Sequence, residues 1–222
     1  DRDWSSDCAL PISCEHFLNI VSLSGSFGTT VSAGAVSAIP VDGKTGVILL
    51  SSTTAATTNA RASVGHGNAD NCIDPQSDPI LLVCEAAPWT ALFSGVNTGR
   101  LSIGFLDTDG SSLPTDAAYF RSDDGGVWNC IARRNSLTSS FTTSLTPVLN
   151  EWHQFAIRLT ASLAEFYIDG AFVGSLNTNL PGGAGRHTGA LCITQKTAAH
   201  VVSGDLAIDL MRIHIPTTVP LP

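Results

Sequence analysis

The chain has 222 residues, of which 43% are hydrophobic and 14% are charged, with a net charge of −8. This is enough apolar material for a large core in a single domain. The acidic charge makes nucleic acid and anionic membranes poor partners, so we expect neither. Because no apolar run of about 18 residues is present, we expect no transmembrane helix.

In chain order, the first 16 residues are polar and turn-like, and they are predicted to form an N-terminal arm or loop. The segment that follows alternates small and β-branched residues, which is typical of short strands. Further strands are predicted where apolar residues alternate or run together between turn signals, at 47–50, 61–65, 80–85, 101–105, 118–121, 127–133, 190–195 and 205–215.

The clearest pattern lies between Glu151 and Leu180. Its apolar residues recur at every second position, first around Phe155 and then around Phe166, as in strands with one buried face. Asp169-Gly170 supplies the positive backbone angles of a tight hairpin turn before a third strand. The segment is therefore predicted to form a three-stranded antiparallel meander.

Strands at roughly 8–15-residue spacing, with turns between them and no amphipathic helix, predict an all-β sandwich. We expect one domain over residues 17–215. The proline-rich residues 216–222 are predicted to form an extended tail, because proline cannot donate to a sheet.

Several segments between residues 44 and 215 occur in a recognisable order: STTAATTNARA at 52–62, EWHQFAIRL at 151–159, EFYIDGAFVGS at 165–175, GRHTG at 185–189 and DLAIDLMRI at 205–213. This order resembles the concanavalin A-like (laminin-G-like and lectin-like) jelly-roll domains of tailed-bacteriophage virion proteins. The resemblance implies a jelly-roll sandwich of two antiparallel sheets.

The resemblance also implies a function at the virion surface, outside the cell: a non-enzymatic capsid decoration (cement) protein or a fibre-like appendage that docks on other proteins. The partners would be other virion proteins, or copies of this chain in a homo-oligomer such as a trimer. The alternative is a carbohydrate-binding module that recognises host or environmental glycans. A glycan-degrading enzyme ranks third.

The six cysteines show no zinc or haem spacing and are predicted to form disulfides. Pairing the cysteines that are nearest in sequence gives the bridges Cys8–Cys14, Cys72–Cys84 and Cys130–Cys192. This is one of fifteen possible pairings. The alternative is a set of free thiols in a reducing compartment.

One acidic loop suggests a calcium site. Asp107, Asp109 and Asp116 form an oxygen-rich group, although the loop lacks the distal glutamate of an EF-hand. The alternative is a solvated hairpin loop, because Asp-Gly is common in turns. No other cofactor is expected.

Catalysis by paired carboxylates is not expected, because the chain's four glutamates fall in an arm, a buried strand, a turn and an exposed hairpin face. The sequence therefore predicts that the chain is not an enzyme. If the chain binds glycans, the aromatic candidates for stacking on sugar rings are Trp89, Tyr119, Trp128 and Tyr167. The alternative role for these four side chains is packing in the core.

Overall fold

The computed structural model describes residues 13–16, 27–44, 46–53, 59–66, 79–95, 98–108, 112–182 and 188–214. These ranges contain strands and no helix. The strands are β1 (Ser13–His16), β2 (Phe27–Ser32), β3 (Ala35–Ile39), β4 (Val47–Ser51), β5 (Arg61–His66), β6 (Ile80–Pro88), β7 (Gly99–Leu106), β8 (Ala117–Asp123), β9 (Asn129–Arg134), β10 (Leu137–Thr142), β11 (His153–Leu159), β12 (Ala164–Ile168), β13 (Ala171–Leu176), β14 (Gly189–Lys196) and β15 (Asp205–His214).

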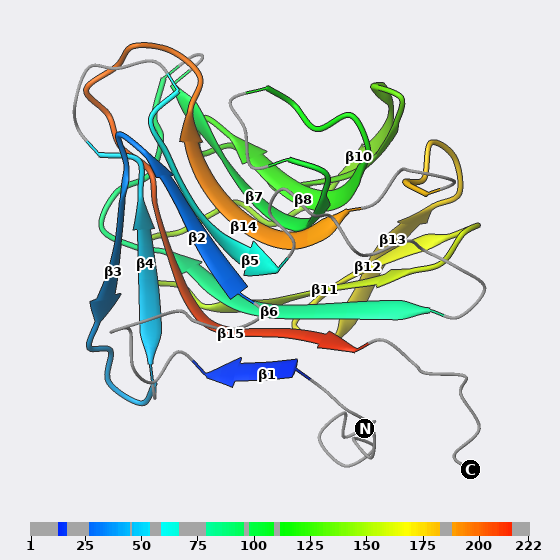
Figure 1. Ribbon diagram of the computed structural model, residues 1–222, viewed down its shortest axis with the longest axis horizontal. Helices are drawn as coiled ribbons and strands as arrows, with labels where there is room; N and C mark the ends of the chain where they lie inside the picture. The colour runs from blue at the N-terminus through cyan, green and yellow to red at the C-terminus, as the bar shows by residue number, and fades with distance from the viewer. Residues whose placement is uncertain are drawn as a thin grey trace.

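The strands form two antiparallel sheets that lie one over the other (Figure 1). Sheet A has the order β13-β12-β11-β6-β15-β4-β3, with β1 also paired to β15. Sheet B has the order β10-β9-β8-β7-β14-β5-β2. The prediction of an all-β sandwich built from two antiparallel sheets is confirmed.

The predicted meander corresponds to β11, β12 and β13, which pair in sequence order. Side chains of β12 alternate between buried and half-buried, as the period of two requires. The turn between β12 and β13 has positive φ at Asp169 (52°) and Gly170 (76°), as the hairpin prediction requires.

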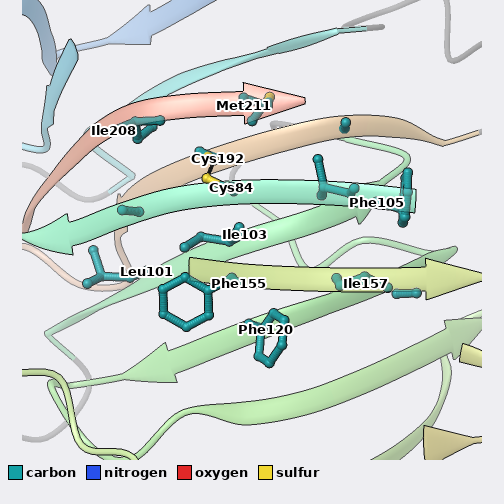
Figure 2. Close-up of a cluster of buried hydrophobic side chains, with 14 of the residues drawn as sticks. Cys84, Leu101, Ile103, Phe105, Phe120, Phe155, Ile157, Cys192, Ile208 and Met211 are labelled. Carbon is teal, nitrogen blue, oxygen red and sulfur yellow. Dashed lines mark hydrogen bonds between the residues drawn. The ribbon is translucent and has the colours of Figure 1, made fainter. Parts of the chain in front are cut away.

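The hydrophobic core fills the space between the two sheets. Aromatic rings of both sheets meet there: the rings of Phe120 and Phe155 lie 5.1 Å apart and those of Phe120 and Phe166 lie 5.2 Å apart, with edge-to-face geometry. Figure 2 shows Phe120 and Phe155 beside each other within this cluster. Such pairs stabilise a core by about 0.5–1.5 kcal/mol each beyond the burial of their area.

Trp128, which precedes β9, belongs to this core. Its side chain is fully buried, and its ring centroid lies 4.8 Å from that of Phe155. It is therefore not available to stack on a sugar, and its prediction as a glycan-binding residue is corrected to core packing.

The cysteine arrangement differs from the predicted disulfides. Cys84, Cys130 and Cys192 are buried free thiols, and the Sγ atoms of Cys84 and Cys192 lie 3.4 Å apart across the two sheets (Figure 2). Cys130 lies on β9, three strand spacings from Cys192 on β14, or about 14 Å. Because a disulfide needs Cα atoms within about 7 Å, the predicted Cys130–Cys192 bridge is wrong.

The predicted Cys72–Cys84 bridge is also wrong, because Cys84 is a free thiol. The predicted Cys8–Cys14 bridge lies outside what the structure describes, since Cys8 is in an undescribed segment and only the backbone of Cys14, in β1, is described. Residues 13–16 of the predicted arm form β1, which pairs with β15, while residues 216–222 are not described. Within the described ranges, no helix is long and apolar enough to cross a membrane.

Candidate functional site

The candidate site is the face of sheet B that points away from sheet A, which we call the outer face of sheet B. On β7 the side chains of Leu101, Ile103 and Phe105 enter the core, so the intervening residues point to the outer face. Strands β7, β8 and β14 bend so that this face is on the inside of their curve (Figure 1). Side chains from different strands therefore converge on it.

Part of the outer face is apolar. A second cluster of buried hydrophobic side chains, separate from the core between the sheets, lies on it: Leu106, Ala117, Tyr119, Ile131, Leu191 and Ile193. These side chains are at most 5% exposed, so they are already covered in the folded chain.

Beside this apolar cluster, the strand register places polar side chains in a row. Gln195 on β14 pairs with Arg61 on β5 and with Arg100 on β7, and Arg100 in turn pairs with Asp123 on β8. Directly paired residues point to the same face of a sheet, so these four side chains are neighbours at strand spacing. The row thus brings together residues that lie up to 134 positions apart in the sequence.

Two further arginines lie on this face. Arg121 lies on β8, two residues before Asp123, and its Nη1 donates a hydrogen bond of 3.2 Å to the hydroxyl of Tyr119. Its Nε lies 2.9 Å from Asp123 Oδ2, an ion pair that lacks the angle of a hydrogen bond. Arg133 on β9 pairs with Ala117 of the apolar cluster, and its Nη2 donates to the carbonyl of Ser136.

Several of these polar groups are buried without a partner. Among the residues that the structure describes, Nε2 of Gln195 and Nε of Arg61, Arg100 and Arg133 are buried and have no hydrogen-bond partner. Gln195 is only 3% exposed and Arg133 only 8%. A buried donor without an acceptor costs about 1–3 kcal/mol, so a cluster of them calls for an explanation such as a ligand.

Burial also changes the electrostatics of the row. Desolvation lowers the pKa of Arg100, an effect that the nearby charge of Asp123 opposes. Because a guanidinium is a very weak acid, Arg100 remains protonated at neutral pH. The row therefore holds a partly desolvated positive charge.

The predicted stacking residues are dispersed. Tyr119 lies on the outer face of sheet B, though it is nearly fully buried within the apolar cluster. Trp89, which follows the end of β6, and Tyr167 on β12 are half-buried, and they pack against the rings of Trp152 and Phe172 respectively. The structure thus brings only one of the four predicted residues to the candidate site.

The predicted calcium loop shows a different use of its carboxylates. Asp107 accepts hydrogen bonds from the backbone N–H groups of Thr115 and Asp116, while Asp116 accepts one from the N–H of Asn135. Asp109 lies outside the described residues. Elsewhere in the described ranges, no group of three His, Cys, Asp or Glu side chains could hold a metal, so calcium binding stays a prediction.

The glutamates lie away from the outer face of sheet B. Glu85 forms an ion pair with Lys44, and Glu165 forms one with Arg158, both on sheet A. Burial disfavours the Lys44 ammonium, but the hydrogen bonds and charges of Glu85 and Asp209 outweigh it and raise the Lys44 pKa. These glutamates therefore hold ion pairs on the opposite sheet.

No family model and no curated protein matches the chain. Solved structures do share its fold. A protein of unknown function from Shewanella oneidensis MR-1 matches with a TM-score of 0.64 and 16% identity, over 91% of this chain and 84% of the other.

Two further structures are related to sugars. The carbohydrate recognition domain of Emp47p matches with a TM-score of 0.56 and 10% identity, over 92% of this chain and 95% of the other. An endo-β-1,4-glucuronan lyase from Trichoderma reesei matches with a TM-score of 0.58 and 10% identity, over 87% and 92%. At these identities the likeness shows the fold, which is the concanavalin A-like, lectin-type sandwich that the sequence predicted.

The prediction that the chain is not an enzyme requires correction. Besides the lyase, the structures with this fold include a bacteriophage carbohydrate esterase and a transglycosylase. A paucity of suitable glutamates is therefore no basis for excluding enzymatic activity, because this scaffold carries several kinds of glycan chemistry.

Sequence reasoning did not identify the arginines or Gln195 as site residues. The sequence does contain one local signal for two of them. Arg121 and Arg133 each lie inside a strand whose other residues are mostly buried, where a charged side chain is costly unless it has a partner or a function. What the sequence does not contain is the order of β5, β14 and β7, which alone places Arg61, Gln195 and Arg100 side by side.

Proposed function

We propose that the chain binds carbohydrate on the outer face of sheet B. A sugar ring carries hydroxyl groups around its edge and C–H groups on its faces, so it matches a surface that combines hydrogen-bonding and apolar side chains. The observation that carries the proposal is the row Arg61–Gln195–Arg100 beside the apolar cluster. In this row Nε of both arginines and Nε2 of Gln195 are buried without a hydrogen-bond partner among the described residues.

The similar structures support this choice over protein docking. A carbohydrate recognition domain and glycan-active enzymes have the same sandwich, so the scaffold is compatible with sugar ligands. Fold alone does not define function, and the proposal therefore depends on the residues of the outer face of sheet B.

Replacing Gln195 with alanine tests the site. Titration calorimetry against a panel of oligosaccharides is expected to show binding by the natural chain and a loss of about 3–10-fold in affinity for Gln195→Ala, as expected for one or two hydrogen bonds. The matched control is Gln154→Ala, because Gln154 is exposed on β11 of sheet A. Loss of binding in the control but not in Gln195→Ala would place the site elsewhere.

The setting in which the domain acts is also a proposal. The order of motifs between residues 44 and 215 supports a place on a bacteriophage virion, with other virion proteins or further copies of the chain as neighbours. A glycan-binding face would there attach the particle to a host surface.

A further inference from the structure

We infer that the ligand of the outer face of sheet B is an anionic glycan, with acidic groups repeated along its chain. This inference rests on the proposed function and specifies its ligand class. Three observations carry it: the sign of the charges on this face, the burial of their polar atoms, and the electrostatic interaction between its arginines.

The charge of this face is opposite to that of the whole chain. The sequence has 11 Lys and Arg against 19 Asp and Glu. On the described strands of sheet B, however, the outer face carries four arginines, and Asp123 is the only carboxylate paired into it. An acidic protein that gathers guanidinium groups on one buried surface has a local field that attracts anions.

One acidic group of the ligand would bind to the row Arg61–Gln195–Arg100, which ends beside Asp123. Asp123 is paired in register with Arg100 and also forms the ion pair with Arg121, so one carboxylate serves two guanidiniums. Arg61, at the other end of the row, and Gln195 between them have buried N–H donors without acceptors among the described residues. A ligand carboxylate there would accept these hydrogen bonds and balance the charge, in the geometry that arginine favours.

A second acidic group fits beside Arg133. This side chain is 8% exposed, and its Nε is a buried donor without an acceptor in the described part of the chain. Along the register, Arg133 opposes Ala117, which is six residues from Asp123 on the same strand, so about 20 Å separates the backbone positions. The charged ends of the side chains approach each other more closely, because, besides desolvation, the charge of Arg133 contributes to lowering the pKa of Arg100. Several guanidinium groups that act on one another in this way favour a ligand with more than one acidic group.

A nucleic acid would supply the same repeated negative charge, but the rest of the molecule disfavours it. The net charge of −8 repels a phosphate backbone, and the aromatic ring on this face, Tyr119, is buried to 1% exposure and cannot act as a base-stacking platform. An acidic glycan has fewer charges per length and needs no stacking platform, so it fits the arginines with less repulsion from the rest of the chain.

Binding of defined oligosaccharides tests the inference. The probes are oligouronates of two to eight units, a sulfated oligosaccharide and a neutral glucan of equal length, titrated into the full chain at low and high salt. We expect oligouronates to bind at least 10-fold more tightly than the glucan, with affinity rising with length and falling with salt. The sulfated probe shows whether the face requires carboxylates or any acidic group.

Arginine variants locate the acidic groups. Arg100→Gln and Arg133→Gln are each expected to reduce oligouronate affinity about 10-fold or more and to leave the affinity for glucan within 3-fold. The matched control is Arg158→Gln on sheet A, which is expected to bind as the natural chain does. Thermal unfolding without ligand verifies that each variant is folded at the temperature of the titration.

Two results would overturn parts of the account separately. Equal binding of glucan and oligouronate, with loss in Gln195→Ala, overturns the anionic class and leaves carbohydrate binding in place. Absence of binding to every probe, acidic and neutral, overturns both proposals.

Discussion

Replacing Trp128 with alanine is expected to destabilise the protein by about 3–5 kcal/mol, the largest loss of stability that we expect from any single substitution. Trp128 is fully buried, and its ring packs on Phe155. Its backbone also forms hydrogen bonds with Leu145 and Thr143, which fix the position of the segment before β9. For a chain of this size the thermal midpoint should fall by roughly 6–20 °C in a calorimetric scan.

Two control variants separate core packing from sugar stacking. Trp128→Phe keeps a ring and removes the indole N–H, which is buried without a hydrogen-bond partner among the described residues, so its effect should be much smaller. Trp89→Ala removes a half-buried ring from the segment after β6, and its effect on stability should also be smaller. A stable Trp128→Ala protein that has lost only glycan binding would restore the stacking role that the sequence suggested.

Oxidation of Cys84 and Cys192 to a disulfide is expected to stabilise the fold strongly. The two Sγ atoms already lie 3.4 Å apart, and the bridge would close a loop of 108 positions. A loop of about 100 residues corresponds to about 4.7 kcal/mol in the chain-entropy account, or roughly 10–20 °C in the thermal midpoint.

The oxidation should be carried out during refolding, because burial raises the pKa of the Cys192 thiol and keeps it unreactive in the folded protein. Glutathione disulfide is the oxidant: the two thiols lose two protons and two electrons, and two glutathione thiols form. Peptide mapping should find Cys84 linked to Cys192, and Cys130→Ser should keep the gain in stability whereas Cys84→Ser should lose it. A Cys72–Cys84 peptide, or equal midpoints for reduced and oxidised protein, would contradict the prediction.

The fold was predictable from the sequence because the relevant signals are local. The alternation around Phe155 and Phe166 defines two strands and their buried face, and Asp169-Gly170 defines the turn that follows. Strand β10 was not predicted, since its residues, LTSSFT, are mostly polar and exposed and carry little periodic signal.

Pairings between distant strands were not predictable in this way. Proximity along the chain assigned Cys192 to Cys130, whereas the strand order separates them by two intervening strands and puts Cys84 across the core from Cys192. The candidate site was unpredictable for the same reason. Arg61, Gln195 and Arg100 become neighbours only through the pairing of β5, β14 and β7. Local pattern therefore defines the strands, and sheet topology defines what the strands bring together.

The side-chain Nε–H resonances of arginine report directly on the proposed binding of glycan at the outer face of sheet B. In a nuclear magnetic resonance titration of isotope-labelled protein with an oligouronate, the resonances of Arg61, Arg100 and Arg133 should shift together and saturate at one ligand concentration, while that of Arg158 on sheet A stays in place. Saturating shifts at Arg158, with none at the three arginines of sheet B, would contradict the account.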